Sequence, residues 1–158
     1  AAQNENINYI KEPVNALDYN FQAKDLLTMY TAFHHFSDKD AKKLLTNAVK
    51  NNCSICINEF VQRDFKSLLM VIPSPFFMLF LMPFVRPFDF KRLFFTYIIP
   101  LIPLVTLWDI IVTVLRIRNK AELMTMSEEF THYNWYYVEK KTNLFLKVSC
   151  FIGVPKDA

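Results

Sequence analysis

The sequence predicts an α/β domain that is built on a mixed sheet and carries an apolar helical insertion. An apolar strand, a helix and a second apolar strand follow one another over Asp25–Tyr30, Ser37–Asn51 and Ser54–Phe60. This order is typical of a right-handed parallel crossover. Two strands rich in aromatic and branched residues, Tyr133–Glu139 and Leu144–Val154, close the chain as an antiparallel hairpin with a turn over Lys140–Asn143. We expect this hairpin to lie beside Ser54–Phe60. The segment between these two groups consists of long apolar runs interrupted by prolines.

Composition limits the function classes. The 158 residues are enough for one domain with a normal core, and they are 53% hydrophobic, with 16 Phe and a single Gly. The net charge of +3 is small and its Lys and Arg are scattered, which indicates a solvated surface and no nucleic-acid partner.

The first predicted element is a short strand over Ile7–Lys11, which ends where Glu12 and Pro13 follow. Asn15 and Ala16 come directly after it. An Asn at this place is typical of a turn, and its side-chain oxygen can also accept a hydrogen bond from a ligand, so both interpretations stay open.

Two adjacent histidines follow the strand Asp25–Tyr30, in the loop TAFHHF. In open α/β sheets, ligands bind at the carboxyl ends of the strands, so this loop is the predicted place of a site. A neutral imidazole can accept a proton near pH 7, which makes His34 and His35 candidate catalytic groups. Alternatively, one of them, His35 in particular, is a core residue that satisfies backbone groups.

The helix Ser37–Asn51 has clear local signals. Ser37 with Asp40 resembles a capping box in which Asp replaces Glu, and Asn51 with Asn52 predicts a left-handed stop. Apolar residues at helical spacing form one face of this helix, namely Ala41, Leu44, Leu45, Ala48 and Val49.

The cysteines predict neither a metal site nor a disulfide. Cys53 and Cys56 are three residues apart in a predicted strand, so they point to opposite faces, and Cys150 stands alone on the last strand. We therefore expect reduced thiols and a cytoplasmic protein.

The insertion covers residues 64–118 and contains two apolar runs, Leu68–Val85 and Leu93–Leu115. Each run is near the length that spans a bilayer, so a transmembrane hairpin is one interpretation. Prolines interrupt both runs, and Asp109 places a charge inside the second. Short amphipathic or interfacial helices that form a cap over an apolar site fit these interruptions better. If they form such a cap, the helices should be broken at the prolines and the Phe side chains should converge on a cavity near His34. After the insertion, Asn119 and Glu122 predict the start of a helix over Lys120–Phe130.

Several motifs together resemble one family. These are VNA at 14–16, FHHF at 33–36, EFVQR at 59–63, WDIIVTVLR at 108–116 and GVPK at 153–156. They resemble the class I S-adenosylmethionine-dependent methyltransferases, specifically the bacterial members with FHHF after the fourth strand, and only their C-terminal half. The resemblance implies a single truncated domain over 1–158 with a partial Rossmann-like methyltransferase fold, in which 64–118 is a hydrophobic cap insertion. In that fold the third strand lies far from the fourth, so Ile7–Lys11 either lacks its usual neighbours or pairs directly with Asp25–Tyr30.

The resemblance also implies site residues. Cofactor contacts fall on Asn15, Ala16, Thr31, Ala32 and Phe33; catalytic groups on His34 and His35; and substrate contacts on Arg63, Trp108, Asp109 and Arg116. Two positions depart from the family pattern, because Asn15 stands where Asp is usual and Ile110 replaces a glycine.

The implied cofactor is S-adenosylmethionine, and we do not expect this chain alone to bind it, because the glycine-rich turn that holds its methionine end is absent. Two function classes remain. The first is the acceptor-side half of a methyltransferase for a lipophilic or small-molecule acceptor, inactive without its N-terminal half. The second is a membrane-associated, non-catalytic protein whose Phe-rich segment inserts into lipid or binds a partner. Peripheral association with the inner membrane face is compatible with both.

Overall fold

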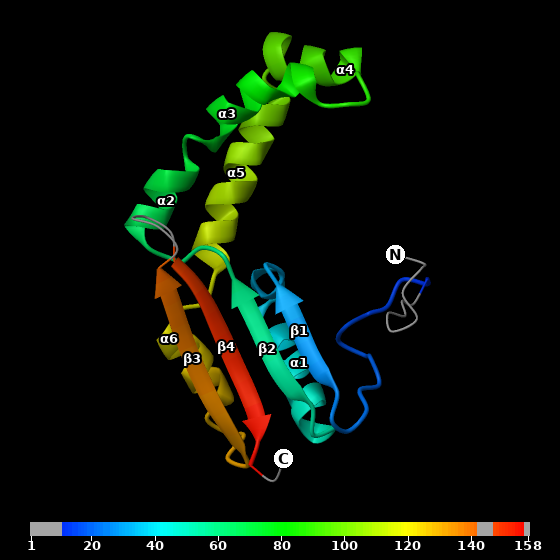
Figure 1. Ribbon diagram of the computed structural model, residues 1–158, viewed down its shortest axis with the longest axis vertical. Helices are drawn as coiled ribbons and strands as arrows, with labels where there is room; N and C mark the ends of the chain where they lie inside the picture. Colours follow the sequence, from blue (N-terminus) through cyan, green and yellow to red (C-terminus); the bar gives the residue numbers. More distant parts are fainter. Residues whose placement is uncertain (1–10, 142–146, 157–158) are drawn as a thin grey trace.

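The computed structural model describes residues 11–141 and 147–156, which form an α/β structure with a four-stranded mixed sheet (Figure 1). The strands are β1 (Leu26–Tyr30), β2 (Ser54–Glu59), β3 (Tyr133–Lys141) and β4 (Lys147–Pro155). They lie in the order β1-β2-β4-β3, with β1 parallel to β2 and β4 antiparallel to both of its neighbours. The α/β class, the parallel first pair and the position of the closing hairpin beside β2 are therefore confirmed. Lys140 and Lys141, which were predicted to belong to a turn over Lys140–Asn143, instead continue β3; residues 142–146 lie outside the described residues.

Helix α1 (Asp38–Lys50) connects β1 to β2 and starts at the predicted N-cap. The Ser37 hydroxyl accepts a hydrogen bond from the Asp40 N–H at 3.1 Å and donates one to Asp40 Oδ2 at 2.7 Å. Asp40 thus meets the cap hydroxyl and not the Ser37 backbone N–H, because Asp is one methylene shorter than the usual Glu. After the helix, Asn52 has a φ of 54°, which is the predicted left-handed stop.

The core lies between one face of the sheet and the helices α1 and α6 (Lys120–Ser127), which cover that face (Figure 1). Its centre contains the apolar face of α1 and the inward side chains of two strands, among them Leu44, Leu45, Ile55 and Phe151, all at most 1% exposed. Helix α6 begins with the predicted capping box but ends at Ser127 instead of Phe130. Phe130 follows as a turn residue, and its backbone N–H donates to the Ser127 carbonyl at 3.0 Å.

The opposite face of the sheet is exposed in the part of the chain that the structure describes. Leu26 and Tyr30 on β1 are 60% and 64% exposed, and Tyr136 and Val138 on β3 are 53% and 52% exposed. Strand β1 is also an edge among the described strands. The predicted strand Ile7–Lys11 lies outside the described residues apart from Lys11, which belongs to no strand.

Cys150, the one cysteine of β4, has a neighbour that the sequence did not predict. Its Sγ lies 3.5 Å from Cys56 Sγ on the adjacent strand β2, and both are free thiols. The sequence pattern could not predict that these two thiols are neighbours, because their distance depends on the pairing register of β4 and β2. Burial and the Cys56 thiol raise the pKa of Cys150 to about 11, so its thiol stays protonated near neutral pH. Cys53 faces elsewhere, with its Sγ 3.2 Å from the Gln22 carbonyl oxygen.

Residues 64–118 form a helical hairpin, which we call the apolar hairpin. One arm consists of α2 (Phe65–Val71), α3 (Ser74–Leu81) and the short turn η2 (Met82–Phe84), and the other arm is α5 (Leu101–Arg116). Between the arms, α4 (Phe90–Leu93) and η3 (Phe94–Ile98) form the tip. Figure 1 shows the arms side by side, running away from the end of the sheet where β1 and β2 terminate.

The prediction that prolines break the helices is confirmed in part. Helix boundaries fall at Pro73, Pro83 and Pro100, but Pro75 and Pro103 lie in the first turns of α3 and α5, where a proline needs no backbone N–H donor. The prediction that the Phe side chains of the insertion converge on a cavity near His34 is wrong for the described residues. Phe76 and Phe80, for example, are 72% and 74% exposed. The reason is geometric: the hairpin extends away from the sheet instead of folding over it.

Candidate functional site

The site predicted at the carboxyl end of β1 is a tight loop followed by a single turn of helix, η1 (Phe33–His35). Thr31 leaves the strand with a φ of 50°, and its N–H donates to the Asn58 carbonyl of β2 at 2.9 Å. Because the backbone reverses at Thr31, the FHH sequence is placed over the end of β2, where Glu59 is the last strand residue.

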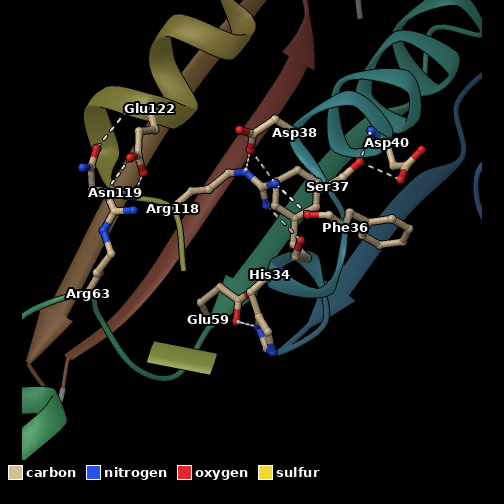
Figure 2. A network of polar contacts seen from close by, with 11 residues as sticks. His34, Phe36, Ser37, Asp38, Asp40, Glu59, Arg63, Arg118, Asn119 and Glu122 are labelled. Atoms are coloured by element: carbon tan, nitrogen blue, oxygen red, sulfur yellow. Dashed lines mark hydrogen bonds and ion pairs between the residues drawn. The ribbon is translucent and has the colours of Figure 1, made fainter. Parts of the chain in front are cut away.

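A buried pair, His34 and Glu59, is the centre of this site (Figure 2). The two residues are 4% and 7% exposed. One Glu59 oxygen accepts the His34 backbone N–H at 3.2 Å, and the other lies 3.1 Å from His34 Nδ1. A carboxylate can only accept hydrogen bonds, so this geometry favours the tautomer with its proton on Nδ1, and in the neutral imidazole the lone pair is then on Nε2.

His35 is the exposed member of the pair of histidines, with its ring centroid 4.2 Å from that of His34. The alternative interpretation that His35 is the core histidine is therefore wrong. His34 has that place, because the 3-10 turn directs its side chain toward β2.

Arg118 fixes this loop to the end of the apolar hairpin, and sequence reasoning missed it. Its guanidinium donates to the carbonyls of Phe33 and Phe36 at 3.1 and 2.8 Å, and to Asp38 Oδ1 at 2.9 Å (Figure 2). It also lies 5.1 Å from the centroid of the Phe33 ring, and its side chain is only 8% exposed. The sequence does not distinguish a buried Arg at this position from an exposed one, and most Arg side chains are exposed to solvent.

A second ion pair lies across the same site. Arg63, four residues after β2, donates to Glu122 of α6, whose carboxylate also accepts the Asn119 backbone N–H at 2.9 Å. Partial burial raises the pKa of Glu122, but the hydrogen bonds from Arg63 and Asn119 outweigh it and leave that pKa below its ordinary value.

These residues surround a pocket of about 800 Å³ between η1, α1 and the α5–α6 junction. Three of the residues predicted from the sequence line it, namely His34, Arg63 and Arg116. Its other lining residues come from the same elements: Phe36, Ser37, Asp38, Lys42, Leu115, Arg118, Ala121, Glu122, Thr125 and Met126. The pocket therefore combines cationic side chains with an apolar wall from α5 and α6.

The remaining predicted site residues lie elsewhere. Trp108 is 70% exposed on α5, and Asp109 beside it is exposed too; neither lines the pocket. Ala16 lines a different pocket, of about 500 Å³, along the outer edge of β1. Thr31, Ala32 and Phe33 belong to the loop itself and do not line the main pocket.

Asn15 forms a turn with its own neighbours. Its Oδ1 accepts the Leu17 N–H at 3.1 Å, and its Nδ2 donates to Asp18 Oδ2 at 2.7 Å. This is the turn role that the sequence left open beside the ligand role.

No protein-family model matches the chain, and no curated protein or solved structure matches it either.

Proposed function

We propose that this chain is the acceptor-binding half of an S-adenosylmethionine-dependent methyltransferase that acts on a lipophilic acceptor. The observation that carries the proposal is the buried His34–Glu59 pair at the carboxyl ends of two parallel strands, beside a pocket at the base of an apolar hairpin. Ligands of open α/β sheets bind at such strand ends.

The strand arrangement supports the same proposal. A parallel pair, followed by an antiparallel hairpin whose last strand inserts beside β2, agrees with the way the methyltransferase fold ends. The exposed face of the sheet and the free edge of β1 lie where an N-terminal half would be added to such a fold.

The chain's own residues can hold an acceptor and remove its proton. His34 Nε2 is the proton acceptor, and Glu59 holds the ring in the required tautomer and stabilises the imidazolium that forms. Arg116 lies on the pocket wall, where its charge attracts an anionic group of the acceptor. Holding the acceptor in one orientation is the larger contribution, because methyl transfer depends on an in-line approach.

Two observations support the expectation that this chain alone does not bind the cofactor. The chain's single glycine, Gly153, lies within β4, and the oxygen of Asn15 accepts the Leu17 N–H. When bound by a complete enzyme, the cofactor would supply the methyl sulfonium group, and this chain would supply the acceptor side.

We therefore expect this chain alone to bind S-adenosylmethionine with a Kd weaker than roughly 1 mM, because most polar contacts to the cofactor are missing. Calorimetric titration of the chain measures this value. A Kd below roughly 100 μM, about −5.5 kcal/mol, would contradict the expectation and show that the half-domain forms a cofactor site by itself.

Transfer of a radiolabelled methyl group to a membrane-lipid extract tests the function itself. The protein used is a longer polypeptide in which a glycine-rich strand–turn–helix precedes this chain. The variant His34→Asn keeps an N–H donor for Glu59 but lacks Nε2, so we expect the rate to fall by roughly 10²-fold or more with the fold intact. His132→Gln, at an exposed histidine before β3, is the matched control and should change the rate little.

Equal rates for His34→Asn and wild type would refute the role of His34 as the base. No transfer by the wild-type polypeptide, with its cofactor bound, would refute the methyltransferase proposal and favour the non-catalytic, membrane-associated alternative.

A further inference from the structure

The apolar hairpin contains most of the exposed apolar surface of the described chain. Of the 29 large apolar side chains exposed among the described residues, 22 lie between Phe65 and Leu115. Water-soluble proteins rarely expose so large a continuous apolar surface without a partner that covers it. The exposed residues occur on both arms and at the tip, with Phe76 and Phe80 on α3, Leu104 and Trp108 on α5, and Phe90 on α4.

The two arms have no charged face. No Asp, Glu, Lys or Arg occurs between Ser67 and Val85, or between Leu93 and Trp108. A helix that lies flat on a membrane surface keeps one strongly polar face in water, and neither arm has such a face. A helix that is apolar on all sides is either buried in protein or surrounded by lipid. In the 20-residue arm Phe65–Phe84, only 17% of the most apolar window is buried by protein.

The length of the hairpin matches a bilayer. The arm Phe65–Phe84 has 20 residues, 18 of them in α2, α3 and η2, and at the helical rise it extends about 30 Å, which is the thickness of the hydrocarbon core. The second arm, Leu101–Arg116, has 16 residues and extends about 24 Å. The tip segment Phe90–Ile98 is bent by 75° relative to that arm, so it lies across the end of the hairpin.

Charged residues stand at both ends of the apolar band. Arg63, Lys66 and Arg116 lie at the base beside the sheet with one acidic residue, Asp64. The tip likewise has Arg86, Lys91 and Arg92 with Asp89, so cations predominate at both ends. Cations at these two levels would face the two headgroup layers. Within the band, Asp109 is the one charged residue, and it lies near the middle of α5, about 10 Å along the helix from Arg116. A charge at this depth is costly in lipid, so Asp109 is the residue that opposes the crossing.

Several polar groups of the hairpin are paired within it, which lowers the cost of placing them in lipid, whereas Ser74 Oγ and Arg92 Nε have no hydrogen-bond partner among the described residues. The Thr96 hydroxyl donates to the Arg92 carbonyl at 2.6 Å, and the Tyr97 hydroxyl donates to the Leu79 carbonyl. At the tip, the Arg92 guanidinium donates to the Val85 and Pro87 carbonyls, both at 2.7 Å, and closes the turn between the arms.

We propose that the apolar hairpin crosses a lipid bilayer, with the sheet on one side and the tip, carrying Arg86, Lys91 and Arg92, in the headgroup layer of the other side. The occupant of this surface is lipid and not another protein, because the apolar surface surrounds both arms and ends at a cationic layer on each side. This topology is independent of the proposed methyltransferase activity. If that activity is correct as well, the pocket beside His34 opens at the level of the headgroups, where an acceptor dissolved in the bilayer can reach it.

Accessibility of single cysteines on the two sides of a membrane tests the crossing. The full chain is reconstituted in sealed vesicles, and a membrane-impermeant maleimide is added before or after detergent. Lys91→Cys reports on the tip, and Lys39→Cys, at an exposed position of α1, reports on the sheet; labelling of the unsubstituted chain is subtracted. We expect each site to react at least tenfold more from one side, and the two sites from opposite sides. Reaction of both sites from the same side would overturn the crossing.

Flotation with vesicles of phosphatidylcholine and phosphatidylglycerol tests the lipid contact by a second route. We expect the double variant Phe76→Arg/Phe80→Arg to lower the membrane-bound fraction at least tenfold. The matched control Leu26→Arg, an apolar residue exposed to a similar degree on the sheet, should change it less than twofold. Circular dichroism of each variant confirms that the fold is kept. A wild-type chain that stays soluble without lipid as a defined dimer, and does not float with vesicles, would refute the proposal.

Discussion

Replacement of Glu59 by alanine is expected to lower the free energy of unfolding of the sheet by about 3 kcal/mol, one of the two largest effects of any single substitution considered for this chain. Glu59 accepts both the backbone N–H and the Nδ1–H of His34, and both residues are buried. Removal of the carboxylate leaves two buried donors without an acceptor, at about 1–3 kcal/mol for each donor. The loop that carries His34 would then lose its attachment to β2.

Urea unfolding in detergent, followed by the fluorescence of Trp135 in a Trp108→Phe background, measures this effect on the sheet separately from the hairpin. Glu59→Gln keeps one acceptor oxygen and should lose about 1 kcal/mol, between wild type and Glu59→Ala. Glu128→Ala, an exposed carboxylate at the end of α6, is the matched control and should stay within about 0.5 kcal/mol. If Glu59→Ala unfolds at the same urea concentration as the control, His34 is not held by Glu59 in solution.

The second large effect is expected at Gly153, because β4 crosses Trp135 there without room for a side chain. Gly153 lies directly opposite Trp135 of β3, and a Cβ added to it would come within 2.4 Å of Trp135 Cζ3. The indole cannot move freely, since it stacks on Phe151 with a centroid distance of 5.0 Å and an interplanar angle of 11°. Gly153→Ala should therefore lower the free energy of unfolding by about 2–3 kcal/mol.

A double-mutant cycle tests the cause of this loss. Trp135→Leu removes the ring, so Gly153→Ala in that background should cost at least about 1 kcal/mol less than in the wild type, a coupling expected for residues in contact. Because the cycle removes Trp135, Tyr fluorescence or circular dichroism is the readout. Ile152→Val, on the opposite face of β4, is the control and should lose less than about 1 kcal/mol. Additive losses would mean that the steric contact with Trp135 is not the reason.

The ends of the elements were predictable wherever the signal is local. Ser37 and Asp40 form the N-terminal cap of α1, and Asn119 and Glu122 form that of α6. Asn52, which follows α1, has the predicted left-handed backbone conformation. In each case, the interacting groups are within four residues of one another, so the sequence pattern contains the complete interaction. The parallel pairing of β1 and β2 was predictable for a related reason. When a helix connects two adjacent strands over this length, the strands are parallel and the crossover connection is right-handed.

The contents of the site were predictable only in part. The loop TAFHHF was correctly placed at the carboxyl end of β1, but which histidine is buried depends on Glu59, 25 residues away. Arg118 lies 85 residues from the Phe33 carbonyl that it binds, and no pattern in the chain indicates that contact. Trp108 and Asp109 share a motif with Arg116, yet only Arg116 lines the pocket, because helix α5 turns the other two toward the outside.

By itself, the sequence determined the α/β class, the parallel crossover, the closing antiparallel hairpin and the loop that carries the site, because these follow from local propensity, capping and the handedness of connections. Only the tertiary structure decided the direction of the apolar hairpin. A run of Phe and Leu has the same pattern whether it covers an apolar pocket or enters lipid, since both environments remove the same surface from water. The difference is where the hairpin leaves the sheet. That direction is set where α5 ends beside η1, with Arg118 binding the Phe33 and Phe36 carbonyls, a contact between residues more than 80 positions apart.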